Sequence, residues 1–395
     1  MNPRRGVSVR SRRGWGPGAS EKKLAGTVWF VLPGSIDART GGYAYDRRII
    51  AELRARGWTV EIRELDESFP EPTAAALSGA ARTLAKIPDG ATVILDGLAF
   101  GAMPAEAERE ASRLRLVALV HLPLALEVGI DAAVAARREA SERRALGAAS
   151  LVIATGRWTV SALERYDVGR HRVALVEPGT DRATLARGSA GPQLQLLCVA
   201  TLNPGKGHET LIRALAASAK ASRSAKASPG ATALAERTNW HLTCAGSLTR
   251  HPPTVERVRA LVRAEGLDAR VSLAGELDAE SLEAAYHTAD LFVLATLRET
   301  YGMAVAEAIA HGLPAVTTAT GAAADLIGTA DGAAGLLVPP GDETALATAL
   351  TRVMGDDGLR ERLTAGARRM RDRLPSWEDA GKRMAEALAR VAEHA

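Results

Sequence analysis

The sequence predicts an α/β protein of two doubly wound, Rossmann-like domains that face one cleft. At 395 residues the chain is longer than one ordinary core needs and fits two domains of common size. Short runs rich in Val, Leu and Ile alternate with longer stretches rich in Ala, Arg and Glu, and this alternation stops once, at residues 181–193, before it restarts. Strands that are apolar on both faces and separated by helices form parallel sheets covered on both sides.

The first domain is expected over residues 24–182. Its apolar runs predict strands at residues 27–33, 58–62, 91–96, 114–121, 151–155 and 172–179. Between these runs, residues 45–57 and 132–149 have the pattern of helices that cover a sheet.

The second domain is expected over residues 194–372, after a polar, Gly- and Pro-containing linker at 183–193. An Ala/Ser/Lys-rich segment at 219–238 is expected to form an extended surface loop. The end of the chain, residues 373–395, is predicted to be a helix with Ser376 as its N-cap. The apolar runs of this half predict strands at residues 194–201, 240–246, 270–275, 290–296, 313–318 and 335–341.

The positive charge of the chain is confined to its start. Residues 1–23 hold seven Lys or Arg and one Glu, a charge of +6, while the remainder has 43 basic and 45 acidic residues, a charge of −2. The body therefore lacks the charge of a nucleic-acid binder. The apolar residues of this tail are not spaced periodically, so the tail is expected to be disordered.

The chain is expected to be cytoplasmic. The tail lacks the apolar centre of a signal peptide, and the most apolar stretch, residues 114–130, is too short and too interrupted to span a bilayer. The basic tail and the arginines of residues 132–149 would allow weak peripheral contact with the inner face of an anionic membrane. A solvated helix is the commoner explanation for those arginines.

The two cysteines, Cys198 and Cys244, each lie inside an apolar run that predicts a buried strand. We expect small core residues at both positions, and neither a disulfide nor a metal site.

Candidate functional residues are those that directly follow strands, because open α/β sheets bind ligands beyond the carboxyl ends of their strands. Gly41 and Gly42 precede a helix expected to start near Tyr43, where bare backbone and free N–H groups suit an anion. An ordinary strand-to-helix turn explains them equally well.

His121 ends the fourth strand and is expected to point into the cleft, where it would bond a hydroxyl or share developing charge. A structural histidine is the alternative.

Lys206 lies between two glycines at a helix start in the stretch NPGKGHE. A cation, a helix dipole and bare backbone therefore converge where a diphosphate fits, although a solvated surface lysine is the alternative. Gly207 stands where an ATPase carries the hydroxyl that holds magnesium, and the chain contains no D-x-D sequence. We therefore expect no metal ligands.

The stretch ETYGMAVAE at residues 299–307 contains two glutamates around a predicted helix start. The helix is expected to begin close to Gly302, with the N–H groups of Tyr301, Gly302 and Met303 at its positive end. Glu307 is the only charged residue between Gly302 and Ala310. An anion would bind the helix end, while Glu299 and Glu307 would accept hydrogen bonds from paired sugar hydroxyls.

These stretches together resemble the retaining glycosyltransferases of the GT-B fold, specifically family 4, the glycosyl transferases group 1. The most specific element is the pair of glutamates, Glu299 and Glu307, with seven residues between them, followed by AIAHGLPAV and GLLVPPGD. HLPLALE at residue 121, VEPGTD at residue 176 and KGHETLIRAL at residue 206 fall in the order that the family requires. The resemblance implies a C-terminal helix that crosses back to the first domain.

The resemblance also implies a reaction of the hexosyltransferase class, EC 2.4. A hexose would move from a nucleotide-diphosphate sugar to a hydroxyl of a glycan, a lipid or a small molecule, with the anomeric configuration kept and with no metal or other cofactor. The base of the donor is open between uracil and guanine, with a slight preference for a UDP-sugar. A phosphorylase or an epimerase on the same fold, and a non-catalytic binding protein, are the alternatives. A dehydrogenase is disfavoured, because neither half has GxGxxG after its first strand.

The family assigns roles to the residues singled out above. Glu307 would bind the nucleotide ribose, Glu299 would contact the donor sugar, and His121 would contact that sugar near the reacting carbon. Lys206 would neutralise the leaving phosphate. The diphosphate would lie against the backbone at residues 301–303 and, once the domains close, against residues 41–42.

The chain lacks one positively charged residue of the family pattern. Many members carry an Arg five or six residues before the lysine, where this chain has Thr201 or Ala200. Thr201 is therefore placed among the donor-binding residues, and leaving-group stabilisation would depend more on Lys206 and on backbone dipoles.

Overall fold

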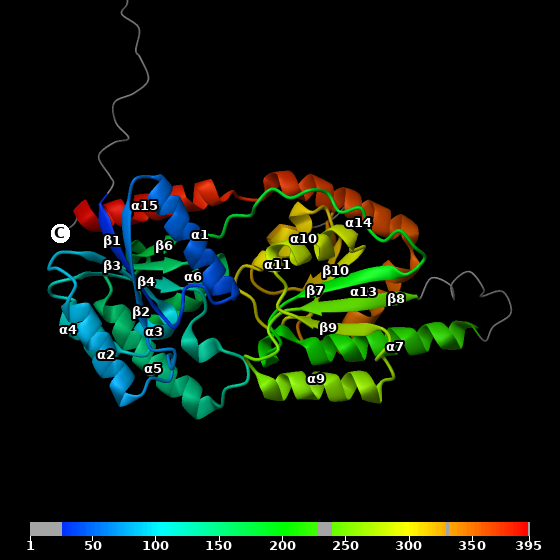
Figure 1. The fold of residues 1–395 in the computed structure, drawn as a ribbon, viewed down its shortest axis with the longest axis horizontal. Helices are drawn as coiled ribbons and strands as arrows, with labels where there is room; N and C mark the ends of the chain where they lie inside the picture. The colour runs from blue at the N-terminus through cyan, green and yellow to red at the C-terminus, as the bar shows by residue number, and fades with distance from the viewer. Residues whose placement is uncertain (1–25, 227–238, 329–331, 394–395) are drawn as a thin grey trace, which may run out of the picture.

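The computed structural model describes residues 26–226, 239–328 and 332–393. The predicted basic tail at 1–23 lies outside the described residues. The chain forms two lobes, each built around one sheet, and Figure 1 shows them side by side.

The first lobe contains a six-stranded, all-parallel sheet with the strand order β2-β1-β3-β4-β5-β6. Its strands are β1 Thr27–Pro33, β2 Thr59–Leu65, β3 Thr92–Asp96, β4 Arg115–Val120, β5 Leu151–Ala154 and β6 Val173–Leu175. Its α-helices are α1 Gly41–Ala55, α2 Ala74–Ala85, α3 Gly97–Phe100, α4 Pro104–Glu110, α5 Ala132–Ala148 and α6 Arg157–Leu163. Short 3₁₀ turns occur at η1 Leu124–Leu126, η2 Glu164–Tyr166 and η3 Arg170–Arg172.

The second lobe repeats this plan, with the strand order β12-β11-β10-β7-β8-β9, again all parallel. Its strands are β7 Leu194–Val199, β8 Trp240–Ala245, β9 Val271–Gly275, β10 Leu291–Leu294, β11 Ala315–Thr318 and β12 Gly335–Val338. Its α-helices are α7 His208–Lys226, α9 Pro252–Ala264, α10 Ala279–Thr288, α11 Met303–Ala310, α12 Ala323–Ile327, α13 Glu343–Gly355 and α14 Asp357–Met370. Short 3₁₀ turns occur at η4 Pro204–Lys206 and η5 Arg371–Arg373.

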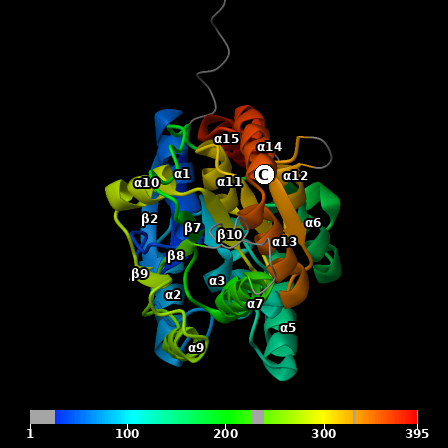
Figure 2. The ribbon, with the colours of Figure 1, turned by 90° about the vertical axis from the view of Figure 1, so that its right-hand side faces the viewer.

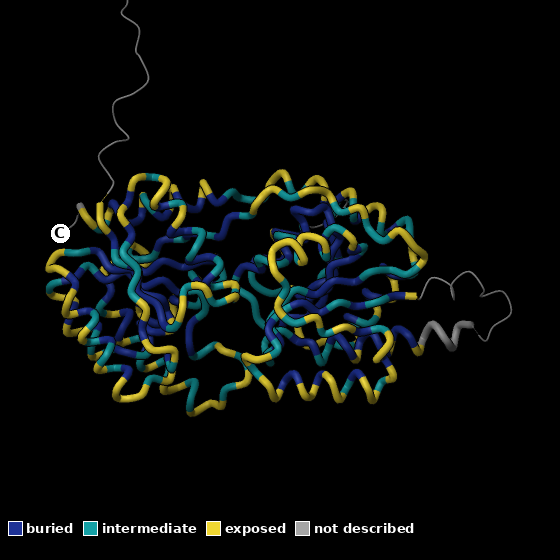
Figure 3. Tube along the Cα trace, viewed as in Figure 1, coloured by how far each residue is buried: buried dark blue, intermediate teal, exposed yellow. Residues whose placement is uncertain are grey.

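The predicted fold class, two doubly wound domains, is confirmed. Each predicted apolar run contains one strand, because a run that is apolar on both faces is stable only between two layers of helices. Figure 3 shows the buried residues gathered in the two sheets and the exposed ones on the outer helices.

One local prediction is wrong. Residues 219–226, expected to begin a surface loop, continue helix α7 instead. Ala and Lys are strong helix formers, so a helix that already packs on a sheet extends through such residues at little cost. The rest of the expected loop, at 227–238, lies outside the described residues.

The loops after the strands of one sheet touch the loops after the strands of the other. The Arg39 guanidinium, after β1, donates to the carbonyl of Leu277, after β9, over 3.1 Å. The Arg298 guanidinium, after β10, donates to the carbonyl of Leu126, after β4. The carboxyl edges of the two sheets therefore face each other, which is the arrangement that forms a ligand cleft between domains.

The C-terminal helix α15, Trp377–Glu393, crosses back to the first lobe as expected. Figures 1 and 2 place α14 and α15 along the same side of the molecule, with α15 next to α1. Trp377 and Met384 are buried in the core beneath α1, and the Asp379 amide donates to the Ser376 hydroxyl over 3.0 Å, the predicted N-cap bond. Among the described residues, no helix is long and apolar enough to cross a bilayer.

Gly381 is the position that lets α15 approach α1. A Cβ atom added at Gly381 would lie 2.4 Å from the Cβ atom of Glu52 on α1, whereas one added at Gly147 of α5 would meet nothing within 4 Å. We predict that Gly381→Ala lowers the free energy of unfolding by about 1–3 kcal/mol, because the helices must separate. Urea unfolding measures this change. Gly147→Ala is the control, expected to be neutral or stabilising by up to about 1 kcal/mol; equal effects of the two changes would show that α15 does not depend on this close contact.

Candidate functional site

The first-lobe wall of the cleft begins at helix α1. The helix starts at Gly41, two residues before the expected Tyr43, because the Thr40 side chain caps it by accepting from the Tyr43 amide over 3.3 Å. A Cβ atom added at Gly42 would lie 3.5 Å from the His121 ring, and one added at Gly41 would meet nothing within 4 Å. The two glycines thus leave bare backbone beside the histidine.

His121 lies directly after β4, as predicted, and its side chain is 23% exposed. Its Nε2 atom is 3.2 Å from Asp46 Oδ1 and 3.9 Å from Asp96 Oδ2. The Thr159 hydroxyl donates to the His121 carbonyl over 3.1 Å, and the Tyr45 ring packs edge-on against the imidazole, with 5.2 Å between ring centroids. Asp46 and Tyr45 therefore hold the imidazole ring, and Thr159 holds the backbone of His121.

Two buried carboxyl groups surround the inner side of this histidine. Asp46 and Asp96 are 0% and 1% exposed, and Asp46 Oδ2 has no hydrogen-bond partner. Burial raises the pKa of Asp46, and burial together with the charge of Asp46 raises the pKa of Asp96 to about 7. Burial alone would lower the pKa of His121, but the Asp46 hydrogen bond and the two carboxylates outweigh it and raise that pKa. The cluster thus favours an imidazolium at the cleft.

Sequence reasoning missed both aspartates. Asp96 is the last residue of β3 and follows the same rule that selected His121, so its position alone was a usable signal. Asp46 lies inside a helix among charged neighbours, where nothing in the sequence separates a buried carboxylate from a solvated one.

Lys206 and Glu299 form an ion pair on the second-lobe wall of the cleft. Lys206 ends the 3₁₀ turn after β7, and its Nζ lies 2.6 Å from Glu299 Oε2. The other Glu299 oxygen accepts from the Thr300 amide over 3.1 Å. Both side chains remain partly exposed, at 28% and 19%. Thr201 lies in the same loop, and its carbonyl accepts from the Asn203 amide over 2.9 Å.

Helix α11 begins at Met303 with Gly302 as its N-cap, as predicted. Gly302 has a φ of 101°, a left-handed conformation that favours glycine, and no side chain caps the helix. Tyr301 is buried in the core of the second lobe, so it holds the turn in place. The free N–H groups at this helix start are suited to an anion.

Glu307 lies one turn further along α11 and is partly exposed. The Tyr286 hydroxyl of α10 donates to Glu307 Oε2 over 2.9 Å. Burial raises the pKa of the Glu307 carboxyl, and the Tyr286 hydrogen bond opposes that rise. Tyr286 was missed by sequence reasoning, because its place on α10 reads as an ordinary core aromatic.

The structure brings these two walls close together through backbone contacts. A Cβ atom added at Gly156, after β5, would lie 2.6 Å from the carbonyl oxygen of Thr300, next to Glu299. Arg298, on the other side of Glu299, bonds the loop that follows His121 and lies over the Trp158 ring, 5.9 Å from its centroid. The loops that carry His121 and Glu299 therefore border one cleft.

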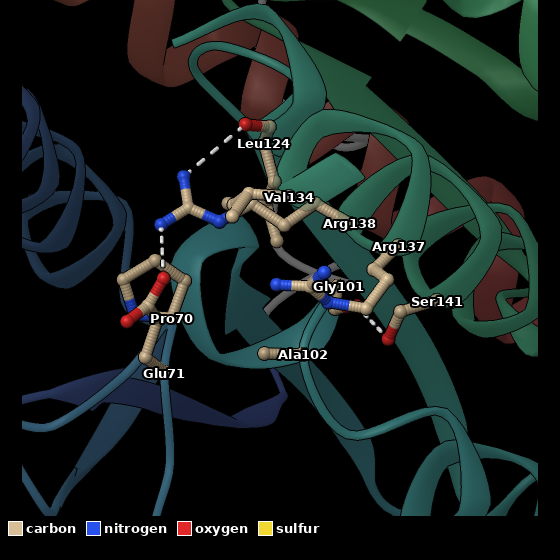
Figure 4. Close-up of a pocket in the computed structure, with 9 residues that line it drawn as sticks. All are labelled: Pro70, Glu71, Gly101, Ala102, Leu124, Val134, Arg137, Arg138 and Ser141. Atoms are coloured by element: carbon tan, nitrogen blue, oxygen red, sulfur yellow. Dashed lines mark hydrogen bonds and ion pairs between the residues drawn. The ribbon is translucent and has the colours of Figure 1, made fainter. Parts of the chain in front are cut away.

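A cavity of about 270 Å³ opens beside the His121 loop in the first lobe. Figure 4 shows Arg137, Arg138 and Ser141 of α5 on one side and Glu71 on the other. It lies among the loops that follow β2, β3 and β4 and is lined by Pro70, Glu71, Gly101, Ala102, Leu124, Val134, Arg137, Arg138 and Ser141.

The arginines of α5 do not form one free basic face. Arg138 pairs with Glu71 and Glu127, Arg143 with Glu139 and Asp167, and Arg144 with Glu108. This pairing favours the alternative of a solvated helix over a membrane-binding face.

A family model described as glycosyl transferases group 1 matches residues 185–370, which span the second sheet and its helices. The second domain is a member of the glycosyl transferases group 1 family. The two glutamates of α11 and its N-terminal loop, together with Lys206, all lie within this family domain.

Two relatives illustrate the similarity in sequence. Both are named D-inositol 3-phosphate glycosyltransferase. The protein of Salinispora tropica is 30% identical over 253 residues, which cover 59% of this chain and 49% of that protein. The protein of a Nocardioides species is 29% identical over 273 residues, 65% of this chain and 57% of that protein. The matched segments thus span about half the length of these relatives.

Solved structures share the whole two-domain arrangement, the GT-B fold. Sucrose-phosphate synthase from Thermosynechococcus elongatus superposes with a TM-score of 0.73 at 20% identity, over 94% of this chain and all of that one. Anabaena Alr3699/HepE, solved in complex with UDP-glucose, superposes with a TM-score of 0.66 at 17% identity, over 92% of this chain and 99% of that one.

The raised pKa of the buried Asp96 predicts how the free energy of unfolding depends on pH. Its pKa is raised from the ordinary 3.8 to about 7, so the folded chain binds more protons than the unfolded chain between about pH 4 and 7. The free energy of unfolding should therefore fall as pH rises through that window. Asp96→Asn should make the free energy of unfolding decrease less steeply with pH. Urea unfolding at half-unit steps from pH 4.5 to 8 measures this dependence. The exposed Asp268→Asn serves as control, and an Asp96→Asn curve parallel to the unmodified one would contradict the raised pKa.

Proposed function

We propose that the chain transfers a hexose from a nucleotide-diphosphate sugar to an acceptor hydroxyl, with the anomeric configuration kept and without a metal. The observation that supports this most is the uncapped start of α11 between Glu299 and Glu307, with Lys206 against Glu299. The helix start and Lys206 suit a diphosphate, and the two glutamates suit the sugar hydroxyls on either side of it.

In this proposal the diphosphate binds the N–H groups at the start of α11, with the Gly41–Gly42 backbone on its other side. The ribose hydroxyls donate to Glu307, whose carboxylate Tyr286 holds in place. The donor sugar hydroxyls donate to Glu299. Lys206 then turns from Glu299 toward the phosphate, where its charge stabilises the leaving nucleoside diphosphate.

A UDP-sugar is the favoured donor in the proposal. Its support is the structural likeness to Anabaena Alr3699/HepE, which was solved in complex with UDP-glucose. Thr201 stands where many family members carry an Arg, so Lys206 and the α11 dipole are assigned the larger share of the leaving-group charge.

His121 approaches the donor sugar from the first lobe. Held by Asp46 and Asp96 as an imidazolium, it donates a hydrogen bond to a sugar hydroxyl near the reacting carbon. The bond from that carbon to the phosphate oxygen breaks, and the acceptor oxygen forms its bond on the same face. The leaving phosphate oxygen takes the acceptor proton, so no protein carboxylate is needed as a nucleophile.

The acceptor is assigned to the first lobe, with the cavity beside the His121 loop as its subsite. This cavity lies among the loops after β2, β3 and β4, at the carboxyl edge of the sheet. The Arg137 guanidinium offers donors, and the Ser141 hydroxyl, which itself donates to the Gly101 carbonyl over 2.7 Å, offers a hydrogen-bond acceptor, so the lining suits a polar acceptor such as a polyol or its phosphate.

The test is product analysis with UDP-glucose, UDP-N-acetylglucosamine and GDP-mannose in EDTA, against a panel of polyol, polyol phosphate and glycan acceptors. We predict an α-linked product from an α-linked donor, released with the nucleoside diphosphate at the same rate with or without EDTA. Lys206→Ala should lower kcat/KM by about 100-fold or more, since it removes a charge that the transition state needs.

The matched control is Lys220→Ala, because Lys220 forms an ion pair of the same 2.6 Å length with Glu265 on the outer surface. It should leave kcat/KM unchanged. A strict Mg²⁺ or Mn²⁺ requirement, or near-normal turnover in Lys206→Ala, would contradict the leaving-group chemistry. Donor binding without turnover would favour the binding protein, and a sugar 1-phosphate product would favour the phosphorylase.

A further inference from the structure

A cluster of two thiols and one imidazole lies next to the loop after β7 that carries Lys206. Cys198 on β7 and Cys244 on β8 are direct partners in the parallel ladder, so both side chains lie on the same face of the sheet. His208 is the first residue of α7, and its Nε2 atom is 3.8 Å from Cys198 Sγ. One ligand atom from each of the three residues lies within 4.8 Å of the other two.

In contrast to the sequence-based expectation of plain core residues at both cysteines, we propose that Cys198, Cys244 and His208 form a three-coordinate site for a thiophilic monovalent ion of the Cu(I) class. Two thiolates and one imidazole are soft donors, and soft donors select Cu(I) over Mg²⁺, Ca²⁺ or Mn²⁺. A structural zinc ion takes four protein ligands, and this cluster offers three.

The distances agree with this assignment. Metal bonds of about 2.3 Å to sulfur and about 2.0 Å to nitrogen, opened to a trigonal angle of about 120°, place the sulfur and nitrogen about 3.7 Å apart. The Cys198 and His208 atoms lie 3.8 Å apart, close to that separation. The other two pairs of ligand atoms lie within 4.8 Å, so small side-chain adjustments would close the site on an ion.

The electrostatic setting favours an ion of single charge. Binding replaces the thiol protons, which leave to solvent, and the oxidation state of sulfur and metal stays the same. Two thiolates and a monovalent ion carry a net charge of −1, which the positive end of α7 and the nearby Lys206 ammonium offset. The divalent alternative would leave a neutral site that gains nothing from these positive groups.

All three side chains of the proposed site are buried in the core of the second lobe. Cys198, Cys244 and His208 are 1%, 0% and 1% exposed. A metal bond through His208 Nε2 would replace its 3.8 Å contact with the Cys198 sulfur by a stronger interaction. The ion would tie β7, β8 and α7 together two residues from Lys206, a role separate from the transfer chemistry.

The test is titration of the purified, reduced full chain with Cu(I), and with Ag(I) as an air-stable equivalent, in competition with a chromogenic Cu(I) chelator. The ion is added both to folded protein and during refolding from urea, so slow entry into the core does not mask affinity. We expect one ion per chain, a thiolate-to-metal absorption band in the ultraviolet, and a rise in Tm. Cys198→Ser and Cys244→Ser should each weaken binding by about 100-fold or more, and His208→Gln by about tenfold.

His241→Gln is the control, because His241 lies on β8 but hydrogen-bonds Ser272 instead of the thiols. It should leave the affinity unchanged, and circular dichroism should show every variant folded. Binding that survives in the Cys198→Ser, Cys244→Ser double variant would overturn the site. Failure of the refolded, unsubstituted chain to compete with the chelator, or a protein mass 2 Da lower from a disulfide, would overturn it as well.

Discussion

The ion pair between Lys206 and Glu299 is the interaction on which the proposed donor site depends. A sugar diphosphate is itself an anion, so a site that uses carboxylates to bind its hydroxyls also repels its phosphates. In the proposed site Lys206, whose Nζ lies 2.6 Å from Glu299 Oε2, would offset that repulsion, and both side chains remain partly exposed.

The first domain holds the imidazole ring of His121 in a fixed position at the carboxyl edge of its sheet. Burying Asp46 and Asp96 is costly on its own, and the imidazole of His121 is the partner that compensates for it. Helix α15 joins this domain to the second one, and Trp377 packs edge-on against Tyr45, with 5.9 Å between ring centroids, while Tyr45 packs against His121. The helix that links the domains thus also supports the histidine.

The fold was predictable from the sequence because parallel strands buried on both faces leave unbroken apolar runs. The order of these runs gave both sheets, and the rule that sites follow strands selected His121, Lys206 and the start of α11. Partners that come from distant elements were not predictable. Asp46 and Tyr286 lie on helices whose sequence patterns are ordinary, and only the packing of those helices brings the two side chains to His121 and Glu307. The extension of α7 to Lys226 was missed because Ala and Lys occur in both loops and helices.

Calorimetric titration of the purified protein and its Glu307→Gln variant with UDP-glucose tests the proposed donor site. The amide keeps the bond from Tyr286 but lacks the charge that ribose hydroxyls would use. We predict saturable binding that weakens by about tenfold or more in the variant, the usual loss for a hydrogen bond to a charged group, with an unchanged Tm. Equal affinity in both proteins, or a variant that is merely less stable, would show that Glu307 is structural and would contradict the donor site described above.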